Sequence, residues 1–118
     1  MNREELMAMF DFSGKTFAVT GGAGVLAGGV VTALACCGAN VMILDRNLAR
    51  LAEIQASAGA AGSRIDGCTV DVMSRESLVA AGETINKRFG PLYGLVNAAG
   101  GNSPKATCSP ALSFFDIP

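Results

Sequence analysis

The sequence predicts an α/β fold with one parallel sheet of about four strands in a chain of 118 residues. Short apolar runs alternate with stretches whose apolar residues repeat at helical spacing, which is the pattern of strands joined by crossover helices. The run from Asn40 to Leu44 is apolar almost throughout, as in a strand buried on both faces of a parallel sheet. Right-handed crossovers give 3-2-1-4 as the simplest strand order. Because half of the residues are hydrophobic, we expect a single domain with a real core.

Each expected element has boundary signals in the sequence. Strands are predicted at residues 15–20, 40–44, 65–70 and 92–96, and helices at residues 25–37, 47–58 and 74–89. Gly38 favours the left-handed geometry that ends the first of these helices, and Ser74 is an N-cap for the last. Gly90-Pro91 stops that last helix because proline cannot continue it. Residues 1–14 are expected to form an N-terminal extension, with helically spaced apolar residues lying on the body, and residues 102–118 an irregular tail.

Composition excludes several kinds of function. The formal net charge is −1 with both signs scattered along the chain, so we expect no nucleic acid and no membrane as a partner. There is no histidine and the four cysteines lack C-x-x-C spacing, so no metal site is expected. The missing histidine also excludes Ser-His-Asp and Cys-His catalysis. The mixed charge of Met1 to Glu5 is not that of a secretion leader, and we expect a cytoplasmic protein.

A glycine cluster follows the first strand directly and opens the first long helix. Gly21, Gly22, Gly24, Gly28 and Gly29 fall within nine positions, with no proline among them. Glycines allow a tight turn and a close approach of the backbone to a phosphate, and the helix start supplies free N–H groups and a positive dipole end. The arrangement therefore predicts a phosphate cradle. Alone, such a cluster is also found wherever a strand meets a helix tightly.

Asp45 indicates that the phosphate bound by the glycine turn belongs to a dinucleotide. It ends the second strand, 21 residues after Gly24, close to the separation at which a carboxylate accepts both hydroxyls of an adenosine ribose. A carboxylate there repels a 2′-phosphate, which favours NAD over NADP. Arg46 leaves NADP open, because its guanidinium could pair with that phosphate. The alternative is that Asp45 is a solvated acid that caps the next helix.

Two further polar motifs stand at strand ends. Asp71-Val72 follows the third strand, and Asn97-Ala98-Ala99-Gly100 follows the fourth. Ligands of open parallel sheets bind beyond the carboxyl ends of the strands, so all four strand ends are expected to converge on one site. Individually, Asp71 could cap a helix and Asn97 could form a turn.

These motifs together resemble the cofactor half of the short-chain dehydrogenase/reductase family. The resemblance rests on Thr20-Gly-Gly-Ala-Gly-Val25-Leu26, Asp45, Asp71-Val72 and Asn97-Ala-Ala-Gly100, in register over about residues 12 to 101. It implies a Rossmann-type three-layer αβα fold, cut short relative to the full family fold, and a nicotinamide dinucleotide as partner. It also implies roles for most of the predicted cofactor residues. Gly21 and Gly24 shape the turn, Leu26 offers its N–H towards the pyrophosphate, and Asp45 binds the adenosine ribose. Asp71 and Val72 frame the adenine, and Asn97, Ala98, Ala99 and Gly100 stand behind the nicotinamide ribose. Val25 and Arg46, next to these residues in the sequence, complete the predicted cofactor site.

The chain departs from the family pattern in the glycine turn. The usual TGxxxGxG places glycine at positions 25 and 27, where this chain has Val25 and Ala27. The variant turn, with Gly-Gly-Asn-Ser-Pro-Lys105 after the fourth strand, is similar to members that act on sugar acids of the mannonate/fructuronate type. The methyl group of Ala27 is expected to weaken or shift pyrophosphate binding.

The family's catalytic residues have no counterpart here. They are a Ser, a Tyr-x-x-x-Lys pair and a helix Asn after the fourth strand, whereas the one tyrosine, Tyr93, is expected inside that strand. We therefore predict no catalytic residue and an inactive cofactor-binding half of an oxidoreductase, or alternatively a non-catalytic dinucleotide-binding or self-associating module. The apolar edge at 92–96 predicts a homo-oligomer, or burial of that edge by Phe114-Phe115.

Overall fold

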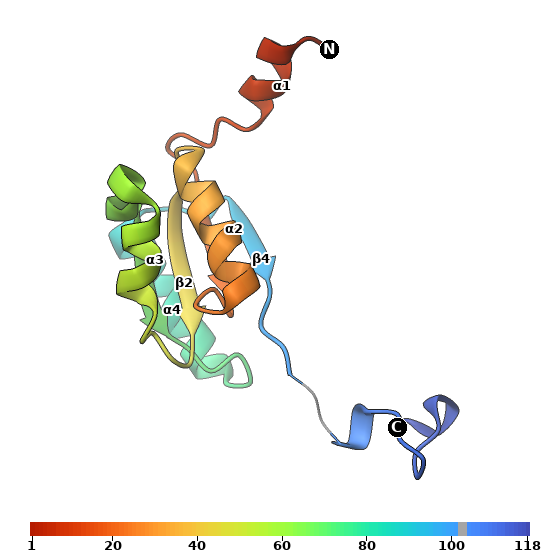
Figure 1. Ribbon diagram of the computed structural model, residues 1–118. Coiled ribbons are helices and arrows are strands. Elements are labelled where there is room, and N and C mark those ends of the chain that lie inside the picture. Colours follow the sequence, from red (N-terminus) through yellow and green to blue (C-terminus); the bar gives the residue numbers. More distant parts are fainter. Residues whose placement is uncertain (102–103) are drawn as a thin grey trace.

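The computed structural model describes residues 1–101 and 104–118; residues 102 and 103, which begin the predicted tail, lie outside the described residues. Figure 1 shows the chain. The helices are α1 (Arg3–Met9), α2 (Val25–Cys36), α3 (Leu51–Ser57) and α4 (Arg75–Arg88), with 3-10 turns η1 (Gly59–Arg64), η2 (Pro104–Ala106) and η3 (Phe114–Asp116). The strands are β1 (Thr16–Thr20), β2 (Asn40–Asp45), β3 (Ile65–Thr69) and β4 (Gly94–Asn97).

The strands form one parallel sheet in the order β3-β2-β1-β4, which confirms the predicted topology. Two apolar clusters cover its two faces, so the fold has three layers. Buried residues of β2 alternate between them: Val41 and Ile43 lie in the cluster that holds α2 and α3, and Met42 and Leu44 in the cluster under α4. This alternation is the physical reason that the second strand is apolar throughout.

The turn from α2 into β2 depends on Gly38. Its φ of +93° lies in the left-handed region, and a Cβ built there would be 2.7 Å from the Ser13 Oγ. The backbone N–H of Gly38 donates to the carbonyl of Ala35 in the last turn of α2. The predicted helix end is therefore confirmed to within one residue.

Most predicted elements differ from the structure by a residue at one or both ends, and two begin at least two residues later than predicted. Residues 47–50 are not helical, since the Asn47 Oδ1 accepts from the N–H of Ala49 and offers the backbone an alternative to helical bonds. The strand expected at 92–96 is observed as β4, so Tyr93 precedes the strand. The Tyr93 N–H donates to the carbonyl of Thr16, the first residue of β1.

The two ends of the chain extend away from the sheet (Figure 1). A capping box between Asn2 and Glu5 stabilises α1, but no residue of α1 is buried, so the expectation that it lies on the body is wrong. Phe114 and Phe115 are 71% and 91% exposed and contact one another, so the expectation that they cover the β4 edge is also wrong. Within the described residues, no helix has the length and apolar character needed to span a bilayer.

Candidate functional site

A crevice of about 630 Å³ lies at the carboxyl end of the sheet. Every strand contributes to it through its last residue or the loop that follows, as expected for an open parallel sheet. The lining residues are Gly21, Gly24, Leu44, Asp45, Arg46, Val70, Asp71, Val72, Met73, Ala98, Ala99, Gly100 and Gly101.

The glycine turn packs against the segment that follows β4. Gly21 has a φ of +64°, and a Cβ built on it would lie 2.9 Å from the carbonyl oxygen of Ala98. Only glycine satisfies both the backbone conformation and this close approach. The turn thus closes one wall of the crevice.

The start of α2 is open to an anion. Its N-cap is Gly24, and no side chain of the described residues caps it with a hydrogen bond. Every helix begins with N–H groups that lack intrahelical partners, and the dipole places partial positive charge there. This end of α2 can therefore receive a phosphate group beside Gly21 and Gly24.

Thr20 joins β1 to the loop after β4. Its Oγ1 accepts hydrogen bonds from the backbone N–H groups of Ala98 and Ala99, both at 3.1 Å. Thr20 is 6% exposed, so these bonds are shielded from water. They hold together the loops after β1 and β4, which both line the crevice.

Asp45 lies at the end of β2 and points towards the glycine turn. Its Oδ2 accepts from the N–H of Ala23 at 3.1 Å, and its Oδ1 accepts from the N–H of Asn47 at 3.2 Å. The N-cap of α3 is Arg50, so the alternative that Asp45 caps this helix is wrong. A carboxylate offers about four acceptor positions, which leaves room for further donors such as ribose hydroxyls.

The loop after β3 forms the remaining wall. The Asp71 Oδ1 accepts from the N–H of Met73 at 2.9 Å, and the Asp71 N–H donates to the Ser77 Oγ at 3.0 Å. These bonds tie the loop to the start of α4. They leave the Met73 side chain 90% exposed at the crevice.

Comparison with known proteins shows to which family the chain belongs. The family profile described as short chain dehydrogenase matches residues 15–114. The chain belongs to the short-chain dehydrogenase family. Its fold is Rossmann-type, and its four-stranded sheet is part of a family fold whose members bind a nicotinamide cofactor.

Relatives of this short-chain dehydrogenase chain include oxidoreductases. It is 38% identical over 115 residues to the uncharacterized oxidoreductase UxuB of Bacillus subtilis, covering 91% of this chain and 41% of the relative. A crystal structure with bound NAD, of a protein from Haemophilus influenza provisionally assigned as a D-mannonate oxidoreductase, superposes with a TM-score of 0.75 at 26% identity, covering 96% of this chain and 44% of that one. NAD⁺-bound xylitol dehydrogenase superposes with a TM-score of 0.70 at 30% identity, covering 76% and 35%. The chain spans less than half the length of these relatives.

The structure brings together most of the residues that the family resemblance implies. All of the predicted cofactor residues line the crevice except Val25, Leu26 and Asn97. Val25 and Leu26 form the start of α2 with side chains 81% and 89% exposed, and Asn97 is the exposed last residue of β4. Sequence reasoning missed Leu44, Val70, Met73 and Gly101 as lining residues; each adjoins a predicted one, so extending the strand-end argument by a residue would have found them.

Proposed function

We propose that residues 1–118 form a single, partial dinucleotide-binding domain of a short-chain oxidoreductase and bind NAD in the crevice. The observation that carries the proposal is that the uncapped start of α2 and the Asp45 carboxylate flank the same glycine turn. A pyrophosphate at the helix start would place the adenosine ribose towards β2, where a carboxylate can accept its hydroxyls. The NAD bound to the Haemophilus structure supports this assignment.

The other predicted residues have roles that the crevice accommodates. Leu26 would offer its N–H to the pyrophosphate from the first turn of α2, next to Gly24 and Val25. Asp71 and Val72 would frame the adenine. The segment from Asn97 to Gly100 would stand behind the nicotinamide ribose.

We infer a preference for NAD over NADP. The Asp45 carboxylate would repel the 2′-phosphate of NADP at short range. Arg46 is exposed and is the one cation among the described residues that line the crevice, so it could offset this repulsion. Titration of Asp45→Asn and Arg46→Met variants with both cofactors separates the two effects.

We further propose that the chain does not catalyse hydride transfer by itself. Hydride transfer needs an acid or base beside the reacting carbonyl as well as the cofactor. Tyr93 precedes β4 and packs on Phe17, with the Lys15 Nζ 4.5 Å from its ring centre. It therefore lies at the amino end of the sheet, whereas the crevice is at the carboxyl end.

We also propose a substrate class for an oxidoreductase of the relatives' length that contained this domain. Similarity to the protein assigned as a D-mannonate oxidoreductase favours a sugar acid, with the alcohol and carbonyl forms exchanging a hydride with the nicotinamide.

Calorimetric titration with NAD and NADP tests the binding proposal. We expect heat and a thermal shift with NAD at millimolar concentration, and weaker binding of NADP. No heat and no shift with either cofactor would refute cofactor binding. A turnover assay with NADH and sugar acids or simple ketones tests inactivity, and steady turnover by the pure chain would refute it.

A self-associating module is the second candidate, because β4 is an edge strand. It pairs with β1 on one side, and its Leu95 is 54% exposed. An apolar edge invites pairing with another chain, so we propose a homo-oligomer through this strand. Light scattering that gives a monomer mass at all concentrations would refute this candidate.

A further inference from the structure

The backbone of Ala23, in the middle of the glycine turn, is held by two side chains. Its N–H donates to the Asp45 Oδ2 at 3.1 Å, and its carbonyl accepts from the Arg50 Nη1 at 3.1 Å. Ala23 is 6% exposed. The two holding residues come from different elements, the end of β2 and the start of α3.

These two bonds fix consecutive peptide planes. Because a peptide unit is planar, a bond to the N–H of Ala23 orients the peptide between Gly22 and Ala23. By the same argument, a bond to the carbonyl of Ala23 orients the peptide that it shares with the N–H of Gly24, the N-cap of α2. Glycines on both sides have wide conformational freedom, so the turn itself is closed by one backbone bond, from the Gly24 N–H to the Gly21 carbonyl, and the two side-chain bonds add to it.

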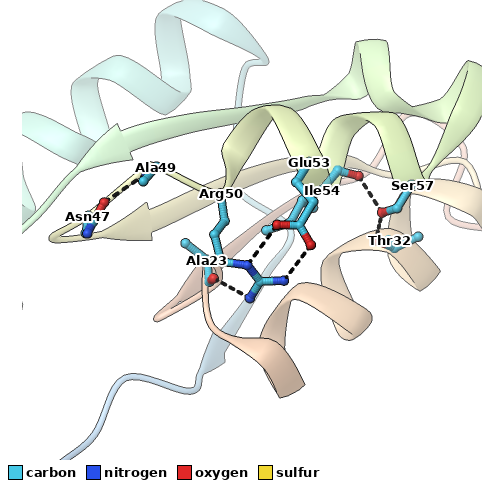
Figure 2. A network of polar contacts seen from close by, with 8 residues as sticks. All are labelled: Ala23, Thr32, Asn47, Ala49, Arg50, Glu53, Ile54 and Ser57. Carbon is cyan, nitrogen blue, oxygen red and sulfur yellow. Dashed lines mark hydrogen bonds and ion pairs between the residues drawn. The ribbon is translucent and has the colours of Figure 1, made fainter.

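Arg50 is itself held in place by Glu53. Its Nε donates to the Glu53 Oε2 at 3.1 Å and its Nη2 to the Oε1 at 3.2 Å, and Figure 2 shows the remaining Nη1 reaching Ala23. This two-point contact orients the planar guanidinium, which an ammonium group could not reproduce. The pair also raises the pKa of Arg50 and lowers that of Glu53, through their hydrogen bonds first and their charges second.

Arg50 acts from outside the crevice. It lines a separate hollow of about 310 Å³ between α2 and α3, with Thr32 and Ser57 further along it, and is absent from the crevice lining. Its effect on a ligand in the crevice therefore passes through the Ala23 peptide rather than through contact.

We propose that Arg50, oriented by Glu53, is a positioning residue that sets the geometry of the pyrophosphate cradle; this rests on the proposed dinucleotide binding. Loss of the Arg50 bond frees the Ala23 carbonyl and leaves the Ala23–Gly24 peptide held only through the Gly24 N–H, which donates to the Gly21 carbonyl at 3.0 Å. The cradle then spends part of its time in conformations that do not bind pyrophosphate. Contacts to adenosine would be made by the Asp45 side chain at the end of β2, which Arg50 does not contact and which the Asn47 N–H also holds, so they should change less.

The test compares Arg50→Met, Arg50→Lys and the control Arg88→Met. Arg88 is also an exposed arginine paired with a carboxylate, its Nε lying 3.3 Å from the Asp66 Oδ2. We expect both Arg50 variants to raise the Kd for NAD about tenfold, with less than a twofold change for Arg88→Met. The Kd for adenosine should change less than twofold in all three. A Lys variant with wild-type affinity would show that charge alone matters, and an equal loss of adenosine affinity would show a general structural effect; either result overturns the proposal.

Amide hydrogen exchange without ligand gives a readout that does not depend on cofactor binding. Exchange at Ala23 and Gly24 should be faster in both Arg50 variants than in the wild type and unchanged in Arg88→Met. Equal exchange rates in Arg50→Met and the wild type would overturn the positioning role. If the wild-type chain bound no NAD, the proposed function would fail, and these exchange rates would still decide whether Arg50 holds the turn.

Discussion

The Oγ1 of Thr20 accepts a hydrogen bond from the N–H of Ala98, joining positions 78 residues apart. The same oxygen accepts from the next N–H along the chain, so one buried hydroxyl holds the loop after β4 against the end of β1. These bonds fix the loop after β4 beside the glycine turn, and both segments line the crevice. A threonine at the end of a buried strand is thereby part of the site without facing a ligand.

Replacing Thr20 by valine keeps the shape and removes the acceptor. We expect a loss of about 1–3 kcal/mol in the free energy of unfolding, because two N–H groups lose their buried partner. Urea unfolding measures it, with Thr20→Ser expected to retain most of the stability. Thr84→Val is a control, since the Thr84 hydroxyl donates to the Ala80 carbonyl on an exposed helix face. A Thr20→Val protein as stable as the wild type would contradict this account.

Gly21 and Gly29 differ in what a methyl group would meet. At Gly21 an alanine combines a φ of +64° with a contact of 2.9 Å to the Ala98 carbonyl oxygen, so we expect destabilisation of about 1–3 kcal/mol. At Gly29, inside α2, nothing lies within 4 Å, and alanine should stabilise by about 0.5–1 kcal/mol. Thermal unfolding of both variants checks the contrast. Equal effects at the two positions would show that the turn adapts to a side chain.

Asp45→Asn tests the cofactor preference. The change keeps the side-chain shape and removes the charge that would face a 2′-phosphate, so the affinity for NADP relative to NAD should rise about tenfold or more. Because an amide has only one acceptor oxygen, one of the bonds to Ala23 and Asn47 is also lost, and some stability with it. Titration with both cofactors measures the ratio. The affinity for NADP relative to NAD should be unchanged in the control Asp116→Asn, which alters a carboxylate in the tail. An unchanged ratio in Asp45→Asn would show that the Asp45 charge does not set the cofactor preference.

The sequence predicted those features of the fold and the site that depend on a few consecutive residues. An apolar run buried on both faces, a glycine turn and polar strand ends predicted the sheet order and most of the crevice, because each pattern reflects a few consecutive residues. The prediction that α3 begins at Asn47 failed because an Asx turn and the helix compete for the same backbone groups, and the apolar spacing does not decide between them.

Contacts between distant positions were beyond sequence reasoning. Arg50 and Glu53, three residues apart, read as an ordinary surface pair on a helix. Nothing in that pattern indicates that the third guanidinium nitrogen reaches Ala23, 27 positions earlier. The exposure of α1 was also unpredictable, because its apolar spacing shows which residues share a face and not whether anything covers that face.

The ion pair with Arg50 should be visible in the pH titration of the Glu53 carboxyl. Arg50 lowers the pKa of the Glu53 carboxyl below its usual range, chiefly through their hydrogen bonds. A lowered folded-state pKa contributes stability that is present above the unfolded pKa of about 4.3 and is lost as the pH falls through the lower folded value. NMR titration of Glu53 should give a midpoint that rises towards about 4.3 in Arg50→Met. The same midpoint in both proteins would mean that the pair does not form in solution.

Self-association through β4 should be sensitive to Leu95. Its side chain is 54% exposed on the edge strand, and a lysine there would place a charge in any interface formed by that strand. We expect Leu95→Lys to weaken association at least about tenfold by analytical ultracentrifugation, because burial of an unpaired charge is unfavourable. Val79→Lys is the matched control, since Val79 is 56% exposed on α4 and away from the edge. If both variants associate as the wild type does, the interface lies elsewhere; if only Val79→Lys dissociates the assembly, α4 rather than β4 forms it.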